Sequence, residues 1–134
     1  MTIDHIGVAV RSIDKGAELW ERLFGYKRIG EPVINTRQKV KVLFLRKEDS
    51  IDVKLIEPTD QSSPAFGAVK AGGGLHHICF RTDSVEHTVE ELQSKGCRVL
   101  FPPQPGEAFC NELIAFLYAG LGLNFELIDT DKRA

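Results

Sequence analysis

An internal repeat constrains the fold of this 134-residue chain more than any other sequence feature. The dipeptide His5-Ile6 recurs as His77-Ile78, which lies 72 positions further along the chain. At the same offset, the apolar run 41–45 aligns with 113–117, and residues 53–57 align with 125–129. Matches at three separate places with one fixed period are typical of a repeated structural unit. The sequence therefore predicts two copies of one module.

Each copy contains the same order of secondary-structure signals. A β-branched, apolar run opens each copy and predicts a strand. A helix follows, beginning after a capping serine (Ser12 or Ser84) and ending at a glycine (Gly25 or Gly96). Three further strand-like runs complete each copy. We therefore expect an α+β fold of two βαβββ modules related by a pseudo-two-fold axis, with strands near 3–10, 27–35, 39–47 and 51–57, then 76–82, 97–101, 111–118 and 123–129.

The two modules are short enough to form one domain together. We expect a single domain over residues 1–134, with module one at about 1–57, a linker at 58–74 and module two at 75–130. The linker is expected to contain a short helical turn near 64–70. The proline-rich segment 102–106 is expected to be a loop, because proline cannot donate a hydrogen bond to a neighbouring strand.

The charge balance and the hydropathy pattern exclude several classes of partner. Seventeen basic and nineteen acidic residues give a formal net charge of −2, which argues against a nucleic-acid partner held by charge. No apolar run approaches the roughly 20 residues that span a bilayer, so we expect no membrane partner. The first residues carry no signal-peptide pattern, and three cysteines without a Cys-x-x-Cys pair suggest no disulfide framework. A cytoplasmic protein is expected.

The repeat places four polar side chains at equivalent positions of apolar strands. His5 pairs with His77, and Lys54 pairs with Glu126. Two histidines and one carboxylate that converge on a sheet have the composition of a metal site. Hydrogen-bonded core histidines and a plain Lys54–Glu126 salt bridge are the alternatives. Strand alternation directs His76 to the face opposite His77.

Four segments along the chain resemble one known family. They are Asp4-His5-Ile6-Gly7-Val8-Ala9-Val10, Leu55-Ile56-Glu57-Pro58 followed by Ser63-Pro64-Ala65, Gly74-Leu75-His76-His77-Ile78-Cys79-Phe80, and Phe125-Glu126-Leu127. The chain thereby resembles the vicinal oxygen chelate superfamily of glyoxalases, bleomycin resistance proteins and dioxygenases, and is most similar to its methylmalonyl-CoA epimerase branch. The resemblance implies that the two modules form one open, cup-shaped mixed sheet.

The resemblance also implies a divalent metal inside the cup, such as Co, Mn, Zn, Ni or Fe. Its ligands would be His5, His77 and Glu126. The remaining ligand position, where the family has glutamine, glutamate or histidine, is Lys54 in this chain. Three outcomes are open: the other three residues hold the metal, Lys54 is neutral and tolerates it, or Lys54 replaces the metal and pairs with Glu126.

A second departure from the family concerns proton transfer. The position of the epimerase glutamate base is Val42 in this chain. Strand alternation allows Glu112 to face the cavity as a substitute base. The predicted catalytic residues are therefore Glu126 or Glu112 as the proton carrier, with Lys54 as the electrostatic anchor or acid.

The leading function hypothesis is a small enzyme that moves a proton next to a thioester or a related carbonyl. It would be an isomerase or epimerase, or a lyase of the glyoxalase type, with an acyl-CoA or another thioester as substrate. One alternative is a non-catalytic protein of the same fold that binds a drug or metabolite. A second alternative is a dioxygenase with an iron triad. A homodimer is expected, because open sheets have edges that need covering.

Overall fold

The computed structural model describes all 134 residues, and they form eight strands, three α-helices and one turn of 3₁₀ helix. Each half of the chain contributes a strand, a helix and three further strands, and helix α2 lies between the halves. The elements are β1 (Thr2–Ala9), α1 (Ile13–Phe24), β2 (Lys27–Asn35), β3 (Val40–Arg46), β4 (Asp52–Pro58), α2 (Phe66–Lys70), β5 (Gly74–Arg81), α3 (Val85–Ser94), β6 (Arg98–Gly106), η1 (Glu107–Phe109), β7 (Glu112–Gly120) and β8 (Leu123–Ile128).

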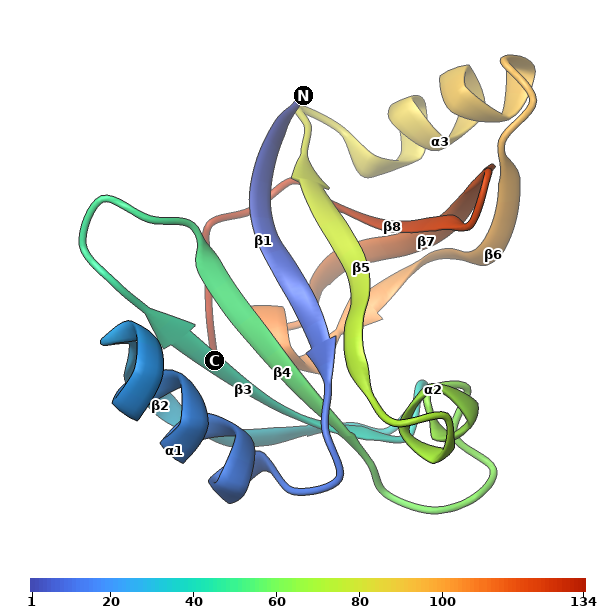
Figure 1. The fold of residues 1–134 in the computed structure, drawn as a ribbon. Coiled ribbons are helices and arrows are strands. Elements are labelled where there is room, and N and C mark those ends of the chain that lie inside the picture. The colour runs from blue at the N-terminus through green and yellow to red at the C-terminus, as the bar shows by residue number, and fades with distance from the viewer.

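All eight strands belong to one mixed sheet in the order β2-β3-β4-β1-β5-β8-β7-β6 (Figure 1). The opening strands of the two halves, β1 and β5, are antiparallel neighbours at its centre. Each then pairs in parallel with the last strand of its own half, β1 with β4 and β5 with β8. Read from either edge, the second, third, fourth and first strands of one half come in that order, followed by the other half in reverse. The prediction of an α+β fold with two βαβββ modules in one open sheet is confirmed.

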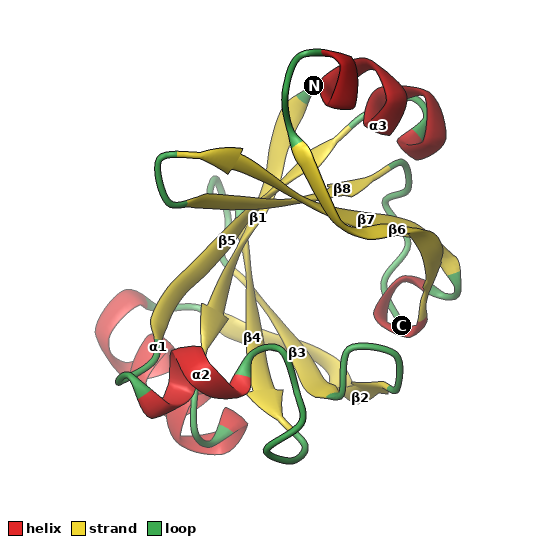
Figure 2. Cartoon of the chain, turned by 90° about the vertical axis from the view of Figure 1, so that its right-hand side faces the viewer, coloured by secondary structure: helices red, strands yellow, loops and turns green.

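Side-chain alternation along the strands divides the hydrophobic core into three clusters. Helix α1 buries Ile13 and Ala17 against the outer face of β3 and β4, and α3 buries Val85 and Val89 against β7 and β8. The third cluster lies inside the curled sheet, whose two halves face each other in Figure 2. None of the helices is both long and apolar enough to cross a membrane. Helices α1 and α3 thus cover the outside of the sheet, whereas α2 contributes Val69 to the cluster inside it.

The helix N-termini repeat one capping arrangement in both halves. Ser12 Oγ accepts from the backbone N–H of Lys15, and Ser84 Oγ accepts in the same way from His87. A carboxylate from the last strand of each half adds a second acceptor. Glu57 accepts from the first helical N–H of α1 at 2.8 Å, and Asp129 does so for α3 at 3.0 Å. A negative charge at this end also favours the helix dipole.

Strand β6 corrects one expectation from the sequence. The segment 102–106, expected to be a loop, belongs to this strand. Because β6 is the last strand of the sheet, one of its sides carries no ladder, and proline is tolerated there. The pairing with β7 is also irregular between Phe101 and Gln104, where two of the prolines lie.

The two serine caps generate a prediction about stability. We expect Ser12→Ala and Ser84→Ala each to lower the free energy of unfolding by about 1 kcal/mol, because one helical N–H loses its acceptor. The caps lie in separate halves, so the double variant should show close to the summed loss in urea unfolding. Ser94→Ala, at the exposed last residue of α3, is the matched control and should leave stability unchanged or slightly raised. Equal effects of all three changes would contradict the capping role.

Candidate active site

Four polar side chains from the four central strands meet inside the curled sheet. They are His5 on β1, Lys54 on β4, His77 on β5 and Glu126 on β8, and each is at most 2% exposed. Glu126 lies at the centre of the group. Its Oε1 is 3.0 Å from His5 Nε2, 3.2 Å from His77 Nε2 and 3.2 Å from Lys54 Nζ. The pairs predicted from the repeat are therefore brought together, whereas their catalytic roles stay predictions.

The Glu126 carboxylate is ionised despite its burial. Burial by itself raises the pKa of such a carboxyl group, but the charge of Lys54 and the hydrogen bond from His5 outweigh it. The pKa of Glu126 is therefore well below its usual range. Lys54 Nζ is also 3.2 Å from Oε2, so the ammonium group bridges both carboxylate oxygens. This pairing offsets the cost of burying either charge alone.

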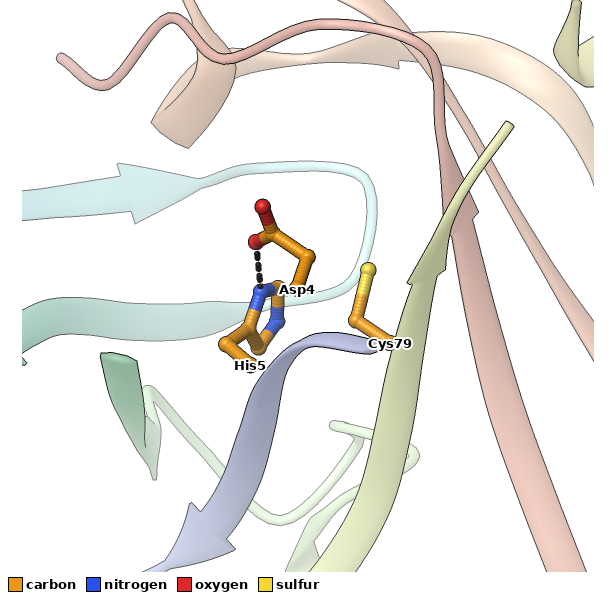
Figure 3. A group of neighbouring side chains, drawn as sticks. All are labelled: Asp4, His5 and Cys79. Atoms are coloured by element: carbon orange, nitrogen blue, oxygen red, sulfur yellow. Dashed lines mark hydrogen bonds and ion pairs between the residues drawn. The ribbon is translucent and has the colours of Figure 1, made fainter. Parts of the chain in front are cut away.

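The ring of His5 is fixed from both sides. Its Nδ1 contacts Asp4 Oδ2 at 2.7 Å, an interaction drawn as a dashed line in Figure 3, and its Nε2 faces Glu126. Both partners are carboxylate oxygens, so the ring is held between two hydrogen-bond acceptors. Asp4 can reach the ring because β1 has a bulge there: Ile3 pairs with Phe80 and His5 with Cys79, which leaves Asp4 unpaired.

A second bulge places His76 beside His77 and corrects the expectation for that residue. Gly7 pairs with His77 and Val8 with Leu75, so His76 is the extra residue of β5. Strand alternation is interrupted, and the His76 ring turns inward instead of lying on the opposite face. Its Nδ1 lies 2.8 Å from His77 Nδ1. His76 is 72 positions from Asp4, so each central histidine is held by the residue that precedes it.

The ring of His77 is buried and closely packed against the backbone of β1. Its Nε2 approaches Glu126 Oε1 without the alignment of a hydrogen bond. Burial lowers the pKa of His77 to about 4, so the ring is neutral at physiological pH. Gly7 lies directly beneath it, and a Cβ added at Gly7 would overlap the imidazole atoms. Glycine at this position therefore makes room for the ring.

A small pocket opens onto one side of the group. Its volume is about 130 Å³, and Lys54, His76 and His77 form its polar wall. The remaining lining is largely apolar and includes Ile56, Ala65, Leu100, Phe101 and Phe116. A larger hollow of about 570 Å³ near Arg81 and Asp129 is polar and contains none of the four central residues. The smaller pocket is therefore the candidate substrate site.

The other side of the group is closed by the C-terminal segment. Arg133 lies over the ring of Phe44, 4.5 Å from its centroid, and its Nη2 is 2.6 Å from Asp4 Oδ2. Ala134 N donates to Ala108 O, next to Phe109. No sequence pattern indicated this contact, because residues 131–134 belong to neither module. It connects Arg133 through Asp4 to His5.

Two positions discussed for proton transfer lie apart from the polar wall. Glu112 pairs with Lys132 at 2.6 Å, is partly exposed and does not line the small pocket. Val42 is 2% exposed in the apolar cluster inside the sheet. His76, which lines the pocket, was expected on the opposite face of the sheet and was not predicted as a site residue. Its relation to Asp4 by the 72-residue offset was the available signal.

The donor atoms of His5, His77 and Glu126 all lie within 4.8 Å of one another, and these three side chains alone are compatible with a divalent metal. Lys54 is not compatible with one, because a protonated amine has no lone pair to donate. Its ammonium already bridges both oxygens of Glu126. At ~4 Å, a divalent ion would be repelled by roughly 8 kcal/mol even at an effective dielectric constant near 20. The four residues together do not fit a metal ion.

A second potential ligand group consists of Asp4, His5 and Cys79 (Figure 3). Burial and the charge of Glu126 raise the pKa of the Cys79 thiol well above its usual value, so it stays protonated. Asp4 is already paired with Arg133 and Arg81. This group is therefore a structural ion-pair network.

Comparisons with known proteins agree with the observed fold. The model of the Glyoxalase/Bleomycin resistance protein/Dioxygenase superfamily matches residues 4–116. Mitochondrial methylmalonyl-CoA epimerase of Dictyostelium discoideum is 28% identical over 98% of this chain and 78% of its own length. A variant of Streptomyces coelicolor methylmalonyl-CoA epimerase, solved in complex with 2-nitronate-propionyl-CoA, is 29% identical with a TM-score of 0.86 over 98% of both chains. A methylmalonyl-CoA epimerase in complex with methylmalonyl-CoA and NH4+ is 29% identical with a TM-score of 0.85, over 99% of this chain and 97% of its own.

The contact between Gly7 and His77 generates a prediction. We expect Gly7→Ala to lower the free energy of unfolding by about 1–3 kcal/mol, because the added methyl group displaces the His77 ring. Gly67→Ala is the matched control: nothing lies within 4 Å of an added Cβ there, and alanine favours helix α2. Urea unfolding of both variants measures the difference. Equal stability of the two variants would contradict the close approach.

The low pKa of His77 makes stability depend on pH. The pKa is about 4 in the folded chain and about 6.5 in the unfolded chain, so the unfolded chain binds more protons between these values. Stability is therefore fully present above about pH 6.5 and falls by roughly 3 kcal/mol as the pH drops to 4. Urea unfolding across this range measures the loss. In NMR, the His77 ring should titrate near pH 4, and a midpoint near 6.5 would contradict its neutral, buried state.

Proposed function

Because the chain belongs to the glyoxalase, bleomycin resistance protein and dioxygenase superfamily, we propose that it is an epimerase-like enzyme that moves the proton next to the carbonyl of an acyl-CoA thioester. The observation that carries the proposal is the ammonium of Lys54, which lies beside His76 and His77 in the polar wall of a small pocket. The acyl-CoA ligands of two solved epimerases of the same fold support this substrate class.

Lys54 is proposed to stabilise the enolate that forms when the α-proton leaves. Its ammonium has three N–H donors, and the two oxygens of Glu126 take two of them. The third is free for the thioester oxygen. A fixed positive charge in a site that excludes water stabilises a developing oxyanion strongly. One solved epimerase holds NH4+ together with methylmalonyl-CoA, and in this chain Lys54 supplies an ammonium group of its own.

The proton carrier requires a group that can both accept and return a proton. Glu126 is a weak base, because the interactions that lower its pKa also stabilise its ionised form. His76 lines the pocket, and its Nδ1 faces His77, which leaves Nε2 without a protein partner. Burial and the charge of Lys54 lower the pKa of His76, so its ring is neutral near pH 7. We therefore place His76 ahead of Glu126 and Glu112 as the proton carrier.

The size of the pocket limits which part of the substrate it holds. A cavity of about 130 Å³ is suited to a short acyl group, while the CoA moiety would extend outside. The apolar wall formed by Leu100, Phe101 and Phe116 excludes water from the reacting carbon. A short, branched acyl thioester is therefore the proposed substrate.

A direct test follows the exchange of the α-proton of methylmalonyl-CoA and propionyl-CoA in D2O. We expect exchange with the wild-type protein and a loss of about 10²–10³-fold in kcat/KM for Lys54→Met, because the oxyanion loses its fixed charge. Lys95→Met, at an exposed lysine after α3, is the matched control and should retain full activity. His76→Gln should lower kcat and remove the limb of the pH profile that reports the base.

The alternatives give different outcomes in the same experiment. Val42, which replaces the epimerase glutamate base, favours a non-catalytic binding protein as the second candidate. Saturable binding of an acyl-CoA without exchange would support this candidate. An activity that Lys54→Met leaves unchanged would contradict the role of Lys54.

We also propose that the protein is a homodimer. Strands β2 and β6 are the free edges of the sheet, and such edges are usually covered. Light scattering at micromolar concentration tests this proposal, and a monomeric mass would contradict it.

A further inference from the structure

We propose that the ammonium group of Lys54 is an internal substitute for a divalent metal ion: it supplies a positive charge beside Glu126 in place of the metal, and removing that charge converts the centre into a metal site. The inference concerns the site that the proposed function uses. It is tested by metal binding and not by turnover, so either proposal can fail without the other.

The first argument is the place of Lys54 among the four strands. His5, His77 and Glu126 supply two imidazoles and one carboxylate, which is a ligand set for transition metals. The fourth strand, β4, supplies the amine at the position that the repeat relates to Glu126. Its Nζ lies 3.2 Å from both Glu126 oxygens, so it already provides the positive charge that a bound cation would bring to that carboxylate.

The second argument is that Lys54 cannot leave. Its side chain is 3% exposed, and the rings of Phe109 and Phe116 lie 5.3 and 5.8 Å from the ammonium. Movement toward solvent would break these cation–π contacts and leave the Glu126 charge buried without its main partner. A metal ion therefore cannot displace the ammonium at low cost.

The third argument is that the supports of a metal site are present. Metal-bound histidines are usually oriented by a hydrogen bond from their second ring nitrogen, often to a carboxylate. Asp4 holds His5 in this manner, and His76 holds His77, so that both Nε2 atoms face Glu126. The only incompatible group in the centre is the ammonium.

Replacement of Lys54 by a neutral oxygen donor should therefore create a metal site. Lys54→Gln removes the positive charge and adds an amide oxygen on the same strand. The experiment uses untagged wild-type protein and Lys54→Gln, both treated with chelator, then titrated with Co²⁺ and followed by visible absorption. Metal content after gel filtration and the unfolding temperature provide independent measurements.

We expect the wild-type protein to retain less than ~0.1 equivalent of Co²⁺ and Lys54→Gln to retain about one, with an increase of several degrees in its unfolding temperature. Combining Lys54→Gln with His77→Ala should abolish this binding. Lys54→Met, which removes the charge without adding a ligand, should bind at least ~10-fold more weakly than Lys54→Gln. Lys95→Gln, at an exposed lysine, is the control and should behave as the wild type.

Two results would overturn the inference. One is stoichiometric Co²⁺ in the wild-type protein that His77→Ala removes, because Lys54 would then tolerate a metal. The other is Lys54→Gln that has a wild-type circular dichroism spectrum but retains no Co²⁺. If Lys54→Gln folds only when Co²⁺ is added, the inference is supported, since metal binding then supplies the missing stability. The wild-type titration requires no variant and can overturn the inference alone.

Discussion

The neutralisation of one buried carboxylate determines how the interior of this protein is arranged. Glu126 has no exposed surface and lies where the four central strands converge. An isolated charge there would be very costly, and each of the other three central strands directs a polar group toward it. Lys54 provides the compensating charge, and the His5 ring, oriented by Asp4, adds a hydrogen bond to the same carboxylate. The proposed chemistry and the folding of the interior consequently depend on the same contacts, and a substitution in this group is expected to affect both.

Much of the architecture follows from the repeat, since two copies of one module can bury their helices and share a sheet in few ways. The same offset also identified the four central side chains, because equivalent strand positions meet near a two-fold axis. Three features were missed for physical reasons. An edge strand tolerates the prolines of β6, a bulge turns His76 inward, and Arg133 lies outside both modules. The alternation of side chains along a strand carries no information about such local exceptions.

The two halves have diverged where their symmetry would place identical groups. Asp4 and His76 occupy equivalent positions and both hold a central histidine, but their surroundings differ. Arg133 and Phe109 cover the side of Asp4, whereas the side of His76 opens into the pocket. The Asp4 side is therefore a closed, ion-paired support, and the His76 side forms part of the pocket wall. The two halves share one scaffold, and the difference between their surroundings leaves the side of His76 open to the pocket.

The bulges at Asp4 and His76 also limit how the chain can vary in length. Each bulge inserts one residue, so that Asp4 and His5, or His76 and His77, both reach the interior. Deleting either extra residue would restore regular pairing at the cost of moving every residue on one side of it to the opposite face of the sheet. A deletion in β1 or β5 is therefore expected to disturb more of the interior than a single substitution at Asp4 or His76. The number of residues that precede His5 in β1 and His77 in β5 thus determines which side chains reach the interior of the sheet.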